Sequence, residues 1–289
     1  MCRRKPSLPP SRTTRANHDD RNFTGRGRTV TAILRLESRK HLRGTLVLAG
    51  AFALLSVFML AVFPSMAEEA EAIEQAFPEH ALVLFGFEAL DTMEGFLGSY
   101  VYPFVWIIFV GLYFAYLGGG TIARDVEERR MDLTLSNPVS RESVVLQKIA
   151  ALWVPLVGLS LALFAVLYGG SILLDEAVDP VALAMVHVLS VPYLLVCAAI
   201  GVVLSVALDR PESAQAGALG AVFVLWLVEG LSELDPDFEW VGDLTPSRYF
   251  DPAAILIHEE YALFDAAVLL AMFFALLGVA LVVFVRRDI

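Results

Sequence analysis

Six runs of hydrophobic residues divide the chain, and polar segments rich in charge separate them. A helix that crosses a hydrocarbon layer about 30 Å thick needs about 20 residues at about 1.5 Å each. Each run has about this length, and none shows the period of two that is typical of barrel strands. The pattern therefore predicts an all-α membrane protein with six transmembrane helices, at about residues 45–63, 102–123, 149–174, 181–208, 213–231 and 266–285.

The composition agrees with a membrane protein. Hydrophobic residues make up 57% of the chain and the mean hydropathy is +0.66, whereas soluble domains are about 45–50% apolar. We therefore expect a multi-pass protein of the cell membrane, in contact with lipid. Nothing in the sequence predicts a nucleic-acid partner.

The basic residues predict the orientation of the spans. If both termini are cytoplasmic, the inner segments are 1–44, 124–148, 209–212 and 286–289, and they hold 20 of the 21 Lys and Arg residues. Only Arg248 lies outside. Because basic residues are retained on the cytoplasmic side, we predict cytoplasmic N and C termini.

Residues 1–29 are polar, basic and too poor in apolar side chains to fold alone. They form either a disordered basic tail that touches anionic lipid or the product of a gene start placed too early, with Val30 as the true start. The membrane domain would then be 30–289. The net charge of −11 and the scarcity of lysine also predict a high-salt host, such as a halophilic archaeon, although a biased genome composition would favour arginine as well.

One charged segment, residues 118–148, lies between the second and third runs. It begins with Gly118–Gly120, which fits close helix packing or a flexible helix exit better than phosphate binding. Residues Thr121–Ser136 contain helix formers and charges of both signs, and Asn137-Pro138 is a stop signal. We predict a short charged helix here, in a cytoplasmic loop with the basic residues Arg124, Arg129, Arg130, Arg141 and Lys148.

Motifs for enzymatic chemistry are missing from the sequence. There is no G-x-x-x-x-G-K-[ST] phosphate loop, and the sequence HEEYA at 258–262 lacks the second histidine of a zinc protease. The five histidines show no metal-ligand spacing. We therefore predict no catalytic residue, no metal and no cofactor in this chain.

Two polar residues interrupt the apolar spans. His187 lies two turns into the fourth run, and Glu229 lies near the outer end of the fifth. A charge inside the bilayer is costly, so such residues face protein or water. They either line a translocation path or snorkel to the outer interface, and we favour the interface.

Several short motifs follow one another along residues 30–289. They read DVEE at 125–128, LTLSN at 133–137, PVSR at 138–141, Lys148, DRPESAQA at 209–216, TPSRYF at 245–250 and FVRRDI at 284–289. Each motif alone is weak, but their order within six spans is specific, and it resembles the permease subunit of an ABC-2 type transporter. One departure is Arg130-Met131-Asp132, where the family usually has Gly-Thr after the acidic stretch.

The resemblance implies an exporter driven by ATP that a separate subunit hydrolyses. The partners would be two copies of an ABC ATPase, which bind ATP and Mg²⁺, and a second permease copy or a paralogue. The loop would transmit movement of the ATPase to the spans. Its coupling residues would be Arg124, Asp125, Glu127, Glu128, Arg129, Arg130, Leu133, Pro138, Arg141 and Lys148.

Two other classes of function stay open on the residues alone. An intramembrane enzyme of the protease type would need polar side chains that converge inside the spans, and only His187 and Glu229 are available. A membrane anchor or sensor would need no ATPase at the charged loop. The transported substrate is not readable from the sequence.

Overall fold

The computed structural model describes residues 20–76, 90–130, 140–232, 234 and 236–286. Within these ranges every regular element is a helix and no strand occurs. Six helical segments are long and apolar enough to cross a membrane. The prediction of an all-α fold with six spans is therefore confirmed.

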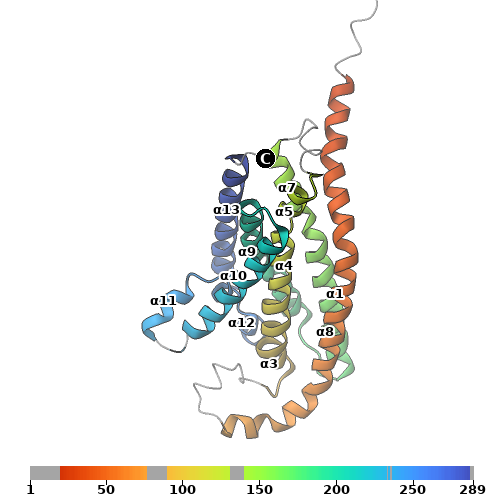
Figure 1. The fold of residues 1–289 in the computed structure, drawn as a ribbon. Helices are drawn as coiled ribbons and strands as arrows, with labels where there is room; N and C mark the ends of the chain where they lie inside the picture. Colours follow the sequence, from red (N-terminus) through yellow and green to blue (C-terminus); the bar gives the residue numbers. More distant parts are fainter. Residues whose placement is uncertain (1–19, 77–89, 131–139, 233, 235, 287–289) are drawn as a thin grey trace, which may run out of the picture.

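Figure 1 shows the spans as a bundle of roughly parallel helices. Two spans are interrupted: the second combines three consecutive helices, and the third combines two. In chain order the span helices are α1 (Asp20–Ala76), α3 (Met93–Phe96) with η1 (Leu97–Val110) and α4 (Gly111–Gly119), α7 (Arg141–Ala151) with α8 (Trp153–Leu173), α9 (Pro180–Ala207), α10 (Pro211–Ser232) and α13 (Leu263–Arg286). The shorter elements are α5 (Ala123–Glu127), η2 (Pro236–Phe238), α11 (Glu239–Gly242), η3 (Ser247–Tyr249) and α12 (Pro252–His258).

Three helical segments begin well before the predicted spans that they contain. Helix α1 begins at Asp20 and runs without a break through the first predicted span and Pro64. It thus includes residues 20–29 of the expected tail, while 1–19 lie outside the described residues. The second span begins at Met93, where the hydroxyl of Thr92 accepts the backbone N–H of Gly95.

Helix α7 also begins before the third predicted span, because a side chain caps its first turn. The hydroxyl of Ser140 accepts the backbone N–H of Ser143 and caps α7 at Arg141. The helix is interrupted at Leu152, between α7 and α8. Pro155 explains the break, because its ring clashes with the carbonyl of the residue four positions earlier, here Ala151.

Helix α9 is the central helix of the bundle. In the most apolar part of α9, 72% of the residues are buried, against 22–28% for α1, α10 and α13. It packs against α4, α13, α10 and α8. Because it is apolar on all sides, it is suited to the core, whereas the outer helices expose apolar faces that suit lipid.

Close packing of α4 on α9 depends on glycine. A Cβ at Gly118 would lie 2.1 Å from the carbonyl oxygen of Ala198, and a Cβ at Gly201 would lie 2.3 Å from that of Ala115. Neither position has room for a side chain, so the two backbones touch directly. This confirms close helix packing as the role of the glycines that end the second run.

The elements of the charged loop lie at one end of the bundle. In Figure 1 the start of α1, helix α5, the start of α7 and the end of α13 share the upper end, and α12 and α3 lie at the other. The described parts of three of the four segments predicted to be on the inner side, 1–44, 124–148 and 286–289, thus lie at the same end.

Candidate functional site: the elbow between α4 and α5

We use the name elbow for residues 118–130, where the second span ends and α5 follows. The N-terminus of α5 is held from another helix: the Ser205 hydroxyl of α9 accepts the backbone N–H groups of Ile122 and Ala123, each at 2.9 Å. The first N–H groups of a helix have no partner within it, and Ile122 provides no side-chain cap. Ser205 therefore fixes the start of α5 to the central helix.

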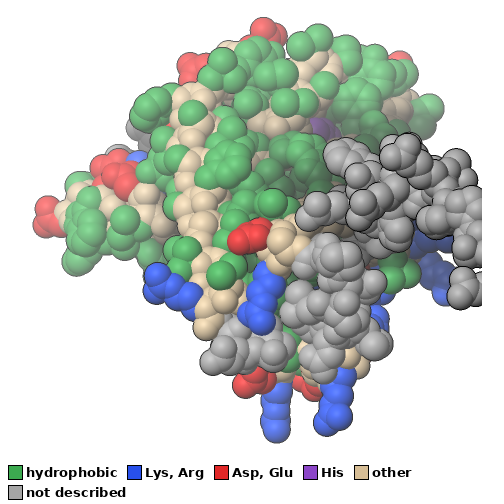
Figure 2. Space-filling model, turned by 90° about the horizontal axis from the view of Figure 1, so that it is seen from above, with side chains coloured by type: hydrophobic (Ala, Val, Ile, Leu, Met, Phe, Trp, Pro, Cys, Tyr) green, Lys and Arg blue, Asp and Glu red, His purple; other side chains and the backbone are tan. Residues whose placement is uncertain are grey.

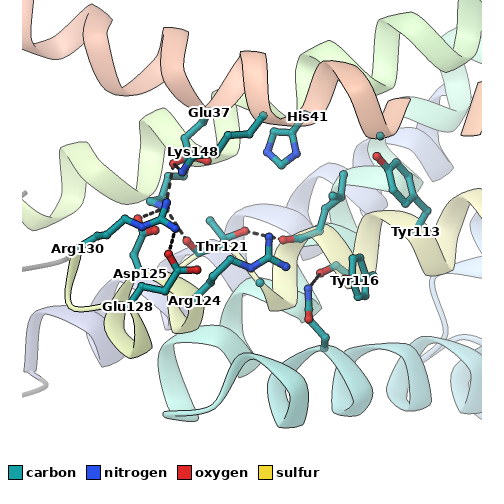
Figure 3. Close-up of a pocket in the computed structure, with 15 residues that line it drawn as sticks. Glu37, His41, Tyr113, Tyr116, Thr121, Arg124, Asp125, Glu128, Arg130 and Lys148 are labelled. Carbon is teal, nitrogen blue, oxygen red and sulfur yellow. Dashed lines mark hydrogen bonds and ion pairs between the residues drawn. The ribbon is translucent and has the colours of Figure 1, made fainter. Parts of the chain in front are cut away.

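Lys148 ties the elbow to two further helices. Its ammonium group lies 2.6 Å from the Asp125 carboxylate of α5 and donates to the carbonyl of Thr121 at 2.6 Å. The Glu37 carboxylate of α1 lies 3.6 Å away. The Lys148 side chain is only 5% exposed. Since a buried charge is costly unless it is paired, this Lys148 cluster (Glu37, Thr121, Asp125, Lys148; Figure 3) holds α1, α5 and α7 in one arrangement.

Two weaker contacts extend the connections to α10 and α13. The side-chain amide of Gln215 in α10 donates to the carbonyl of Tyr116 in α4 at 3.3 Å. Arg141, at the start of α7, donates to the carbonyl of Phe284 in α13 at 3.3 Å, and its guanidinium lies 5.9 Å from the centre of the Phe284 ring. The elbow region is thus linked to helices of all six spans.

The outer side of the elbow is exposed and charged. Helix α5 ends at Glu127, and Arg129 has a φ of 53°, a left-handed conformation that is common where a helix terminates. The predicted helix over Thr121–Ser136 is therefore interrupted after Glu127, and residues 131–136 lie outside the described part of the chain. The exposed side chains are Arg124, Glu127, Glu128, Arg129 and Arg130, and Arg130 forms an ion pair with Glu128.

The ten predicted coupling residues thus fall into separate groups. Asp125 and Lys148 are buried, so they do not form an outer surface. Arg141 is half-buried against α13. Leu133 and Pro138 lie outside the described residues. The remaining five form the exposed side named above.

A cavity of about 520 Å³ opens beside the elbow. One wall is α1, and the others are α4, the elbow, α7 and the start of α10. Figure 3 shows charged side chains from both sides pointing into it. Figure 2 looks down on this end of the bundle. Most of the visible Lys and Arg side chains lie in the lower half of this view, and hydrophobic side chains cover most of the upper half.

His187 lies inside the protein rather than at an interface. It is 6% exposed and its Nδ1 lies 2.9 Å from the carbonyl oxygen of Leu183. The rings of Tyr102 and Trp106 pack edge-on, with centroids 5.6 and 4.9 Å from the imidazole. The interfacial interpretation of His187 is therefore wrong. Glu229 is half-buried on α10, and its place on a translocation path stays a prediction.

His187 and Glu229, the two polar residues within the predicted spans, lie on different helices. The ring and hydrogen-bond partners of His187 come from η1, α8 and α9, whereas Glu229 belongs to α10. Among the described residues, no group of three His, Cys, Asp or Glu side chains could hold a metal ion.

Sequence reasoning missed three residues that position the elbow: Glu37, Ser205 and Gln215. The available signal was a polar residue at the end of an apolar run that is predicted to be cytoplasmic. It was weak, because such residues also occur where a span simply meets water. Ser205 caps a helix that lies 82 residues earlier in the chain, and local patterns do not report such pairings.

Comparison with known proteins agrees with the layout of helices and elbow. A search of curated proteins finds no match. The family model described as ABC-2 family transporter protein matches residues 31–289, nearly the whole chain. This chain therefore belongs to the ABC-2 family of transporter proteins.

Proposed function

We propose that this chain is the permease subunit of an ABC exporter, and that a separate ATPase docks on the outer side of the elbow. Membership of the family implies association with an ABC ATPase. In our proposal two ATPase copies bind ATP and Mg²⁺, a second permease copy or a paralogue completes the membrane part, and both termini face the cytoplasm. The acidic composition leads us to propose a high-salt host.

The observation that carries this proposal is the two-sided elbow. Its outer side presents five exposed charged side chains, three of which (Arg124, Glu128 and Arg130) also border the cavity. Its inner side is fixed by Ser205 and the Lys148 cluster. A partner that pushes on the outer side would therefore move the ends of α1, α7 and α9 together. A ligand can shift an equilibrium between two conformations only if it binds them with different affinities. Because the elbow is fixed to the span helices, it would move with them, and the ATPase could bind the two conformations with different affinities.

Copurification tests the docking surface. The full chain is tagged in its host, extracted gently and analysed for a bound ATPase that carries a phosphate loop. We expect Glu127→Ala/Glu128→Ala to reduce the recovered ATPase strongly. The matched control is Glu68→Ala/Glu69→Ala, an exposed adjacent Glu pair on α1 towards its other end, which should leave recovery unchanged. Equal recovery with both variants would count against the proposal and favour an anchor or sensor.

A further inference from the structure

The cavity beside the elbow lies between two packed groups of helices. On one side α1 packs on α8 and α7, and on the other α4 packs on α9 and α10. The cavity volume of about 520 Å³ is within the range of about 300–1,000 Å³ for small-molecule sites. It is much larger than a single inorganic ion requires.

The side chains that line the cavity leave one positive charge unpaired. Four are basic and three are acidic. Each carboxylate has a basic partner, in the pairs Lys148–Asp125, Lys40–Glu37 and Arg130–Glu128. Among the described residues, the guanidinium of Arg124 forms no ion pair. Arg124 can therefore receive an anionic group, and guanidinium binds phosphate oxygens well.

The remaining walls are only partly polar. Leu117 and the rings of Tyr113 and Tyr116 line the cavity. On the α1 wall, Gly44 is the one position that contributes no side chain to the cavity lining. A wall that combines one cation with apolar and aromatic surface suits an amphiphile better than a free anion. A phosphate group with a glycerol and the first atoms of acyl chains has this character.

The cavity also lies where anionic lipids gather. Arg35, Arg39 and Arg43 are exposed on α1 at a spacing of four residues, so they share one face. They flank Glu37, Lys40 and His41, which line the cavity. Basic segments beside a span attract anionic headgroups from the adjacent leaflet.

We propose that this cavity binds the headgroup of an anionic phospholipid, with the phosphate on Arg124. The lipid would fill the space between the two groups of helices. The proposal needs no ATPase, so it and the proposed function can fail separately.

Native mass spectrometry of the purified full chain tests the site. The probe is phosphatidylglycerol, compared with phosphatidylcholine of the same acyl chains. We expect Arg124→Gln to weaken phosphatidylglycerol binding about tenfold, because a charged hydrogen bond is lost. Arg39→Gln removes an equal charge outside the cavity and should change the affinity less than about twofold.

A second variant blocks the cavity and keeps every charge. A Cβ at Gly44 would lie 3.6 Å from the Tyr113 hydroxyl, an ordinary contact, so Gly44→Leu extends into the cavity without a backbone clash. We expect it to weaken phosphatidylglycerol binding about tenfold as well. A thermal unfolding midpoint confirms that each variant is folded.

Three results would overturn the proposal. The first is unchanged binding in both Arg124→Gln and Gly44→Leu. The second is an equal loss with Arg39→Gln, which would leave only general attraction to the surface. The third is displacement of the lipid by glycerol 1-phosphate at equal concentration, which would make a soluble phosphate the ligand.

Discussion

Removing the Lys148 ammonium should strongly destabilise the arrangement of helices around the elbow. Lys148→Met keeps the length and apolar stem of the side chain but leaves the Asp125 carboxylate, whose side chain is 11% exposed, without its partner at 2.6 Å. It also removes the donor to the Thr121 carbonyl. Loss of one partner from a buried ion pair costs about 3–5 kcal/mol.

The unfolding midpoint in detergent, followed by tryptophan fluorescence, measures this loss. At about 2–4 °C per kcal/mol for a chain of roughly this size, the midpoint should fall by roughly 6–20 °C. The double variant Lys148→Met/Asp125→Asn removes both charges and should recover much of the loss, since no unpaired charge remains.

Two outcomes would refute this reasoning. A Lys148→Met midpoint within about 2 °C of the unmodified protein would mean that the cluster is solvated and contributes little, as surface pairs do. Additive losses in the double variant would mean that Lys148 and Asp125 are not coupled.

The remaining predictions concern the other contacts of the elbow and core. Ser205→Ala leaves two backbone N–H groups of α5 without an acceptor, so the free energy of unfolding should fall by about 1–3 kcal/mol in the same assay. Gly118→Ala places a Cβ 2.1 Å from the Ala198 carbonyl oxygen, so it should lower the free energy of unfolding by about 1–3 kcal/mol or prevent folding. Its control is Gly220→Ala, where a Cβ meets nothing within 4 Å, and this variant should be neutral or stabilising. His187→Lys should lower the yield of folded protein sharply, because it places an ammonium among aromatic rings, whereas His187→Phe should be tolerated.

Hydrophobic run length was sufficient to predict the six spans. Run ends were less informative, because caps decide where a helix begins. Thr92 and Ser140 start the second and third spans through side-chain hydrogen bonds, and both lie outside the apolar runs from which the spans were predicted. The long α1 shows the same limit: helix continues from the polar segment into the span with no change of backbone.

The charged loop was recognised from its composition, but the division of its residues into a buried and an exposed group was not. The resemblance grouped Asp125 and Lys148 with the other coupling residues of the loop, yet the structure pairs them in the interior. That pairing depends on α1 and α7 meeting α5, which the order of motifs does not report. The same limit applies to His187, whose burial comes from rings on η1 and α8.

A crosslinking experiment tests the central claim most directly. A photoreactive amino acid replaces Glu127 on the elbow or, as a control, Glu68 on α1, and the intact membranes are irradiated. We predict that the Glu127 position crosslinks to an ATPase with a phosphate loop and that the Glu68 position does not. No ATPase at Glu127, or equal crosslinking from both positions, would contradict the assignment of the elbow as the docking surface.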